Sequence, residues 1–348
     1  MRALVTGGGG FLGSAVVRRL LARGNDVTVL GRRRYAELEQ LGVLCIQADV
    51  RDAGAIQQAC RGIDAVFHVA ALAGVWGDPR DFWSINVEGT RNVVAACFDN
   101  GVRRLVYTSS PSVVFGRTSL CGVDESQPYP PKFAAEYPRT KAVAEQMVLA
   151  ANGPAVATIA IRPHLIWGPG DPYLIPRVVQ RATSGKLKIV GDGRNRVDIT
   201  YIDNAAEAHV LAADALGPSA ACAGRAYFVS QGEPVVLWDW INELLAGLGI
   251  PPATRKIPFQ IAYAAGAALE TIYHAGRRTS EPPMTRFMAL QLAKDHYFNI
   301  AAAGRDFGFQ PRISTQEGVA RVIASTAAMP GRATELATAA SSHSTGSC

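Results

Sequence analysis

The first 31 residues hold a strand, a glycine-rich turn, a helix and a second strand in close succession. RALVT (2–6) leads into GGGGFLG (7–13), and DVTVLG (26–31) is a second apolar run with β-branched residues. Between the two runs, apolar side chains recur at helical spacing, at Val16, Val17, Leu20 and Leu21. This succession predicts a βαβ unit, and therefore a parallel sheet covered by helices.

The glycine turn at 7–13 predicts a dinucleotide-binding site. Gly7 permits a tight turn, Gly10 lets backbone N–H groups approach a pyrophosphate, and Gly13 lets the helix pack closely on the strand. Phe11 and Leu12 begin the helix, whose N-terminus directs partial positive charge at phosphates. Glycine runs also occur in plain loops, but the flanking strand and helix favour the cofactor interpretation.

The end of the second strand bears on the choice between NAD and NADP. An NAD enzyme usually carries an acidic residue there for the ribose 2′-OH, whereas this chain has Gly31 followed by Arg32, Arg33 and Arg34. A guanidinium can hold a 2′-phosphate through two parallel hydrogen bonds. We expect NADP(H) as the cofactor, bound through Arg32 and Arg33 with Arg32 dominant. The alternative is a solvated basic loop.

Three more apolar runs continue the alternation of strands and helices, at 43–52, 63–71 and 103–110. The predicted strands end at Asp49, at Ala70 and Ala71, and at Ser109 and Ser110. The alternation predicts an α/β protein with a doubly wound parallel sheet, the Rossmann fold. Ligands of such sheets bind at the carboxyl ends of the strands, where these residues lie.

The rhythm of strands and helices weakens beyond about residue 165. We therefore predict an NADP-binding Rossmann domain at 1–165, whose core also takes segments around 190–230. A smaller, mainly substrate-binding C-terminal lobe is predicted at 166–330, and a disordered tail rich in Ala, Ser and Thr at 331–348. Within the lobe, 258–276 is an apolar helical segment. It is interpreted as a helix packed on the lobe, or as an entrance for acyl chains or a membrane-surface contact.

Composition excludes several classes of protein. The net charge is +6, but the arginines are scattered and no basic helix is interleaved with aromatics, so no nucleic-acid partner is predicted. The six cysteines show no CxxC pair and no histidine at ligand spacing, so no metal site is predicted. Met1 leads directly into a strand, and no apolar run is long enough to span a bilayer. A cytoplasmic protein is expected, with a peripheral membrane contact as an alternative.

The segment YPRTK (137–141) places a tyrosine four residues before a lysine, one helical turn apart. Tyr137 and Lys141 could simply lie on a surface helix. The alternative is a general acid beside an ammonium group. A phenol has a pKa of about 10, and we expect Lys141 and a positively charged nicotinamide to lower it toward neutrality. The glycine turn and the serine at the end of the fifth strand favour this second interpretation.

The chain resembles the extended short-chain dehydrogenase/reductase superfamily in several motifs that occur in the expected order. These are TGGGGFLG (6–13), DVRD (49–52), HVAA (68–71), INVEGTRNV (85–93), YTSSPSVVFG (107–116), YPRTK (137–141) and IRPHLIWGPGD (161–171). The resemblance implies that Ser110, Tyr137 and Lys141 form the catalytic set, with Asn86 nearby. Ser110 would orient a substrate carbonyl, and Lys141 would also hold the cofactor ribose. The predicted cofactor set is completed by Asp49, Val50, Ala70, Ala71 and Pro163.

Three stretches resemble the branch of 3β-hydroxysteroid and sterol-4α-carboxylate dehydrogenases: YPRTKAVAEQMVLAANG (137–153), 161–179 and 185–216. Within it, GRRRY, AGVWGDPRDFW and PPMTRF resemble bacterial reductases of 2-alkyl-3-oxoalkanoates in olefin and β-lactone biosynthesis. The resemblance implies NADPH-dependent reduction of a hydrophobic 3-oxo acid. A steroid or sterol-carboxylate dehydrogenase and a sugar-nucleotide epimerase or dehydratase remain alternatives. So does a cofactor-binding regulator without catalysis, which the intact Ser110, Tyr137 and Lys141 set disfavours.

The expected substrate is a small hydrophobic molecule with a carboxylate. The predicted substrate contacts are Trp76, Asn86, Ser112, His164 and Arg196, with Arg196 as the clamp for the carboxylate. Arg196 could instead form a surface salt bridge, and His164 could be structural. The aromatics Phe82, Trp83, Phe115 and Trp167 could cover the substrate or fill the core. A homodimer, and contact with other lipid-pathway enzymes or a membrane surface, are further expectations.

Overall fold

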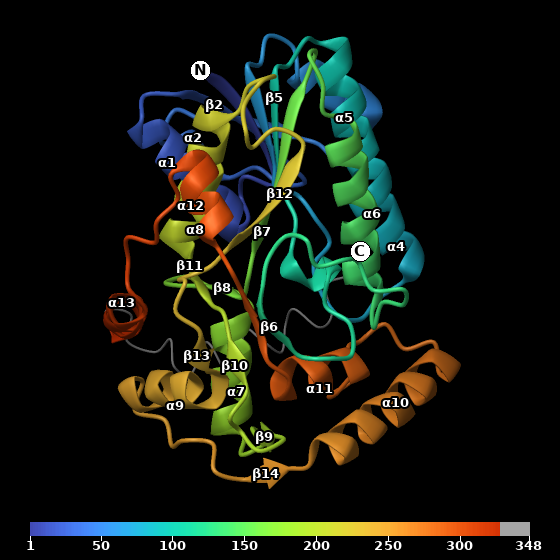
Figure 1. Cartoon of the computed structure of the whole chain (residues 1–348), viewed down its shortest axis with the longest axis vertical. Helices are drawn as coiled ribbons and strands as arrows, with labels where there is room; N and C mark the ends of the chain where they lie inside the picture. Colours follow the sequence, from blue (N-terminus) through green and yellow to red (C-terminus); the bar gives the residue numbers. More distant parts are fainter. Residues whose placement is uncertain (328–348) are drawn as a thin grey trace.

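The computed structural model describes residues 1–327 (Figure 1). Its centre is a seven-stranded sheet in which every pair of neighbours is parallel, in the order β12-β7-β5-β4-β1-β2-β3. The strands are β1 (Arg2–Thr6), β2 (Asp26–Gly31), β3 (Leu44–Gln47), β4 (Ala65–His68), β5 (Arg104–Thr108), β7 (Ala157–Pro163) and β12 (Arg225–Val229). The predicted α/β class with a doubly wound sheet is confirmed. The tail predicted at 331–348 lies outside the described residues.

Helices cover both faces of this sheet (Figure 1). One face carries α1 (Phe11–Ala22), α8 (Ile202–Ala215) and α12 (Ala301–Phe307), and the other carries α3 (Ala53–Ala59), α5 (Gly89–Asp99) and α6 (Glu136–Ala150). The strands are buried on both sides: Val5 and Phe67 point into the first layer, Leu4 and Val66 into the second. This explains why they appear in the sequence as continuous apolar runs and not as alternating ones.

The strand order reverses direction between β1 and β4. From β1 the chain builds outward to β2 and β3, then returns to place β4, β5, β7 and β12 on the other side. The loops after β1 and β4 therefore diverge to opposite faces and leave a crevice between them. Crevices at such reversal points are the usual ligand sites of doubly wound sheets.

A second, smaller set of elements lies at the carboxyl end of the large sheet (Figure 1). It contains the four-stranded sheet β13-β10-β15-β6 and two strand pairs, β11-β8 and β14-β9. The strands are β6 (Leu120–Val123), β8 (Ile166–Trp167), β9 (Ile189–Val190), β10 (Arg196–Val197), β11 (Thr200–Tyr201), β13 (Val235–Val236), β14 (Lys256–Ile257) and β15 (His296–Phe298). The helices are α7 (Leu174–Thr183), α9 (Leu237–Gly247), α10 (Phe259–Ala275), α11 (Arg286–Ala293) and α13 (Thr315–Ala327).

The helical segment between β4 and β5 is interrupted. Helix α4 (Pro79–Trp83) runs into a wide π-helical turn at Ser84–Glu88 before α5 begins. Elsewhere in the fold, a short helix α2 (Ala36–Glu39) follows β2. A π-turn closes i→i+5 hydrogen bonds and accommodates one extra residue, and such turns are frequent at functional sites. A single 3₁₀ turn, Pro111–Val113, follows β5.

Candidate active site

A cleft of about 370 Å³ opens at the carboxyl ends of the central strands. It brings together residues from all seven of the motifs named above, which are far apart in sequence. Predicted residues that line it are Gly7, Gly10, Phe11, Leu12, Gly13, Arg32, Asp49, Val50, Ala70, Ala71, Tyr137 and Lys141. Residues that the sequence did not indicate also line it: Tyr35, Leu72, Ala73, Ile85, Ile166 and Tyr173.

The glycine turn brings two stretches of backbone into direct contact. A Cβ atom at Gly13 would lie 2.1 Å from the carbonyl oxygen of Gly7, and Gly7 itself has φ +69° and lies against the backbone of Ala70. Gly10 begins α1 without any side-chain cap. The first N–H groups of the helix are therefore presented to the cleft, as an anionic pyrophosphate requires. These features fit a dinucleotide.

Tyr35 folds back over the glycine turn. A Cβ atom at Gly9 would lie 1.9 Å from the Tyr35 ring, and one at Gly31 would lie 2.5 Å from its hydroxyl oxygen. Gly31 thus stands where an acidic residue would sit in an NAD enzyme, with Tyr35 filling the space a side chain would need. Arg32 is exposed and lines the cleft, whereas Arg33 does not line it.

Asp49 lies at the floor of the cleft beside β3. Arg51 donates to both carboxylate oxygens at 2.9 Å, so its hydrogen bonds hold the pKa of Asp49 below its ordinary value. The carboxylate is thereby kept charged and fixed in orientation. Val50 beside it packs against Gly89 at the start of α5.

Ser110 and Tyr137 meet in a hydrogen-bonded group beside Lys141. The Ser110 hydroxyl oxygen accepts hydrogen bonds from the Ser112 amide at 3.2 Å and from the Ser112 hydroxyl at 2.9 Å. Its own proton is then free to be donated, and Ser110 contacts the Tyr137 hydroxyl. Ser112, predicted as a substrate contact, instead lies behind Ser110 and orients it.

The ionisation of this group differs from the expectation. Burial raises the pKa of Tyr137, although the hydrogen bond with Ser110 acts to lower it. Burial likewise lowers the pKa of Lys141 to about 7, against the opposing charge of Glu145. The Lys141 ammonium donates to the Thr108 carbonyl oxygen at 2.5 Å and lies 4.1 Å from the centre of the Tyr107 ring. The structure therefore does not show the lowered phenol pKa that was expected from Lys141 and the nicotinamide, because burial outweighs the hydrogen bond with Ser110.

A buried ion pair supports the helix that carries Tyr137 and Lys141. Arg162, on β7, donates to both carboxylate oxygens of Glu145 at 2.6 and 2.8 Å, and Tyr129 donates to the same carboxylate at 2.6 Å. The side chains of Arg162 and Glu145 are only 4% and 0% exposed. Burial acts to raise the pKa of the Glu145 carboxyl. The hydrogen bonds and positive charge of Arg162 have the larger effect and hold that pKa below its ordinary value.

Asn86 lies behind the cleft wall and does not face it. Its amide oxygen accepts from the Leu72 amide at 2.7 Å, and its amide nitrogen donates to the Leu72 carbonyl and to Thr140, each at 3.1 Å. The side chain is thus used to fasten the segment after β4 to α6, next to Lys141. Its position does not support the predicted substrate contact.

His164 is also committed within the protein. The His296 ring donates to the Gln291 carbonyl at 2.8 Å, so its other nitrogen accepts from His164 at 2.6 Å. Burial, with a contribution from His296, lowers the pKa of His164 well below its ordinary value. Both rings are therefore neutral near pH 7 and form a structural pair below β7.

Three other predicted residues lie outside the cleft lining. Arg196 is exposed on β10, with its guanidinium 5.2 Å from the centre of the Tyr297 ring. Pro163 is buried at the end of β7, and Trp76 donates from its indole nitrogen to the Arg278 carbonyl at 3.2 Å. Arg196 and Trp76 are therefore not placed as the predicted substrate contacts require.

Most of the singled-out aromatics belong to the core. Phe82, Phe115 and Trp167 are 2%, 1% and 0% exposed. Trp83 is half-buried beneath the Arg139 guanidinium, which lies 5.3 Å from its ring. Of the two interpretations left open for Phe82, Phe115 and Trp167, the structure supports packing.

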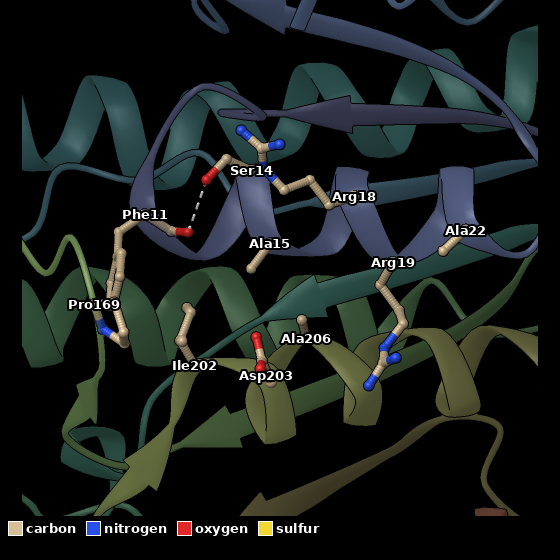
Figure 2. A pocket seen from close by; sticks show the side chains of 10 residues that line it. All are labelled: Phe11, Ser14, Ala15, Arg18, Arg19, Ala22, Pro169, Ile202, Asp203 and Ala206. Atoms are coloured by element: carbon tan, nitrogen blue, oxygen red, sulfur yellow. Dashed lines mark hydrogen bonds between the residues drawn. The ribbon is translucent and has the colours of Figure 1, made fainter. Parts of the chain in front are cut away.

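A second groove, of about 350 Å³, follows the seam between α1 and α8 (Figure 2). Figure 2 shows Arg19 of α1 and Asp203 of α8 on its walls. Arg19 pairs with Glu207 at 2.7 Å, and Asp203 pairs with Arg321 at 3.2 Å. Because these charges are matched within the protein, the groove is a packing seam, and the cofactor site is assigned to the cleft.

Comparison with known proteins agrees with this geometry. The model of the 3-beta hydroxysteroid dehydrogenase/isomerase family matches residues 4–259. A 2-alkyl-3-oxoalkanoate reductase of Stenotrophomonas maltophilia is 51% identical over 94% of this chain and 100% of its own length. A protein of the same name from Shewanella oneidensis is 49% identical over 93% and 86% of the two chains. The mouse sterol-4-alpha-carboxylate 3-dehydrogenase, decarboxylating, is 33% identical over 93% and 90%.

Solved structures share the fold over nearly the whole chain. The crystal structure of gox2253 superposes with a TM-score of 0.76 at 28% identity and covers 94% of this chain and 98% of its own. A dTDP-glucose 4,6-dehydratase from Streptomyces venezuelae, solved with NAD bound, gives 0.74 at 26% identity, covering 97% and 100%. Fold and site together define an oxidoreductase of the extended short-chain dehydrogenase/reductase type. Within that class, the chain belongs to the 3-beta hydroxysteroid dehydrogenase/isomerase family, which confirms the resemblance seen in its motifs.

Proposed function

We propose that this protein is an NADP(H)-dependent reductase that converts a hydrophobic 3-oxo acid, a 2-alkyl-3-oxoalkanoate, to the 3-hydroxy acid. The observation that carries the proposal is that Tyr137 and Lys141 line the cleft that also holds the glycine turn, with Ser110 in contact with the Tyr137 hydroxyl just behind that lining. The two relatives at 51% and 49% identity, both named 2-alkyl-3-oxoalkanoate reductase, support the choice of substrate. A role in olefin or β-lactone biosynthesis is part of the same proposal.

The residues of this chain have distinct parts in the reaction. The bound nicotinamide supplies the hydride. Ser110, oriented by Ser112, donates a hydrogen bond to the substrate carbonyl oxygen, keeps its own proton, and fixes the direction of the carbonyl. Tyr137 is held in its neutral form by burial, and so has a proton to give when the carbonyl oxygen becomes negatively charged. Lys141, close by, has a pKa of about 7 and can carry positive charge near the site at neutral pH.

A panel of substrates tests the reaction. We expect NADPH consumption with a 2-alkyl-3-oxo acid to exceed that with a UDP-sugar. We also expect kcat/KM for reduction of the oxo acid with NADPH to be higher than kcat/KM for oxidation of a 3β-hydroxysteroid with NADP. A sterol-carboxylate dehydrogenase is the second candidate because those relatives, at 33% identity over 93% of this chain, act by name on a carboxylate-bearing sterol. Higher catalytic efficiency with the 3β-hydroxysteroid than with the oxo acid would replace the proposal by that candidate.

The choice of NADP(H) over NAD(H) depends on Arg32. We expect Arg32→Ala to raise the KM for NADPH by about 10-fold or more, since a bidentate charge-assisted contact contributes about 1.5–3 kcal/mol. The KM for NADH should stay nearly unchanged because its ribose lacks the phosphate. Arg34→Ala is the matched control, since Arg34 pairs with Glu39 at 2.9 Å and does not line the cleft. An equal effect on both cofactors would contradict the assignment.

A further inference from the structure

The helix α10 exposes an apolar face that nothing in the described part of the chain covers. Its inner residues pack against α11, and they recur every four positions: Ala262, Gly266 and Glu270 are buried. A Cβ atom at Gly266 would lie 2.7 Å from the Thr285 backbone, so the two elements are in close contact. The residues on the outer side are exposed and uncharged. They are Gln260, Ile261, Ala264, Ala265, Ala268, Thr271, Ile272 and Ala275.

An outer face of this kind is unusual for a surface helix. A helix on a globular protein normally turns charged and polar side chains toward solvent, whereas Ile261 and Ile272 are each 56% exposed here. The only acidic residue of α10, Glu270, points inward and accepts from both the amide and the side chain of Arg286 at 2.6 Å. No negative charge therefore lies on the outer face.

Cations stand at both ends of this apolar face. Arg255 and Lys256 precede α10, and Arg277 and Arg278 follow it, and all four are exposed. The helix spans about 25 Å, so the arrangement is an apolar stripe with positive charge at each end. Figure 1 shows α10 along the outer edge of the molecule, at the end opposite the strand β2. This is the pattern of a helix that lies in a membrane interface among anionic headgroups.

We infer that α10 is a docking helix for an anionic lipid surface. Among the described residues, no helix is long and apolar enough to cross a bilayer, so the contact is confined to one leaflet. A second copy of the chain is a poorer occupant. Two α10 helices packed face to face would bring the cationic ends together in either orientation, and like charges in contact repel.

The docking helix is connected to the wall of the cleft. The Trp76 indole donates to the Arg278 carbonyl at 3.2 Å, and its ring lies 4.4 Å from His274 and 6.1 Å from Tyr273. Trp76 belongs to the segment after β4, whose residues Leu72 and Ala73 line the cleft. The lipid-facing helix and the cleft wall are therefore held together. If the proposed function is correct, a greasy substrate would reach the cleft beside this contact.

Sedimentation of the full chain with vesicles tests the inference. We expect binding to an equal mixture of phosphatidylglycerol and phosphatidylcholine, and little binding to phosphatidylcholine alone. The double variant Ile261→Glu/Ile272→Glu should bind at least about 10-fold more weakly, because it places charge on the inserted face. Arg277→Ser/Arg278→Ser should lose about fivefold for each cation removed, and high salt should reduce wild-type binding in the same direction.

The matched control is Leu41→Glu/Leu44→Glu, which changes two exposed leucines (46% and 63%) distant from α10 in the sequence. It should bind vesicles as the wild type does. Equal thermal unfolding of all variants shows that the helix variants are folded. Unchanged binding by Ile261→Glu/Ile272→Glu overturns the inference. The inference is also overturned if the wild type does not bind vesicles but self-associates with increasing concentration, and if Ile261→Glu/Ile272→Glu abolishes that self-association. No arm measures reductase activity, so the result is independent of the proposed substrate.

Discussion

We expect Tyr137→Phe to lower kcat for reduction of the oxo acid by about 10²- to 10⁴-fold, the usual contribution of a positioned general acid. The change removes one oxygen atom and leaves the ring to pack beside Ser110. Burial raises the pKa of Tyr137, so the proton donor form is fully populated at neutral pH and is lost only as the pH rises through that raised value. The dissociation constant for NADPH, measured by fluorescence titration, should stay within about twofold, because the substitution leaves the glycine turn and Arg32, which are proposed to bind the cofactor, unchanged.

Tyr297→Phe provides the control for this substitution. Tyr297 lies on β15 beneath Arg196 and does not line the cleft, so kcat should match the wild type. Retention of most of the wild-type rate by Tyr137→Phe would show that another group supplies the proton. Loss of NADPH affinity together with rate would show instead that the phenol has a binding role.

The second large effect concerns stability. We expect Glu145→Gln to lower the free energy of unfolding by about 3–5 kcal/mol, because it leaves the buried Arg162 guanidinium without a counter-charge. Since Glu145 also raises the pKa of Lys141 against burial, its loss should move the Lys141 pKa further below about 7. Denaturant unfolding measures the first effect, and the pH dependence of kcat/KM measures the second.

A double variant separates the two effects. Glu145→Gln/Arg162→Met removes both charges and should recover much of the lost stability, since a buried pair is often nearly neutral when replaced as a whole. The Lys141 pKa should nevertheless stay low, because the carboxylate is still missing. Glu317→Gln removes a charge from an exposed pair with Arg321 and should change neither quantity. Equal stability of Glu145→Gln and the wild type would mean that the pair does not support α6.

The features that sequence predicted correctly are those with local signals. Continuous apolar runs predict strands that are buried on both faces. The spacing of Gly7, Gly10 and Gly13 predicts that the start of the helix packs closely against the backbone of the preceding turn. A Cβ atom at Gly13 would lie 2.1 Å from the Gly7 carbonyl oxygen, so only glycine fits at this position. The class of fold and the family could be obtained in this way from one chain.

The position of Tyr35 could not be obtained from the sequence. The stretch GRRRY (31–35) does not indicate that the chain turns back and places the Tyr35 ring over the glycine turn. A side chain at Gly9 or Gly31 would collide with the Tyr35 ring. Glycine at these two positions is therefore explained by Tyr35, and only the structure shows this contact. From the sequence alone, Gly31 indicates only that the carboxylate typical of NAD enzymes is missing.

The surroundings of the predicted substrate residues and the pKa values could not be obtained from sequence for a different reason. Asn86 bonds to Thr140, 54 positions away, and Arg196 lies over Tyr297, so their roles depend on tertiary neighbours. The spacing of Tyr137 and Lys141 correctly suggests that they are close, but their pKa values depend on burial. Burial is a property of the folded chain, and here it determines the direction of the pKa shift for both groups.

The wide turn at Ser84–Glu88 holds one residue more than a regular α-helical turn. Deleting one residue there would convert it to a regular turn and leave the orientation of α5 unchanged. Val93, Ala96 and Cys97, which are fully buried, would keep their places in the core. A deletion of one residue within α5 itself would instead rotate every later side chain by about 100°, so homologous chains should differ in length by one residue at this turn more readily than within α5.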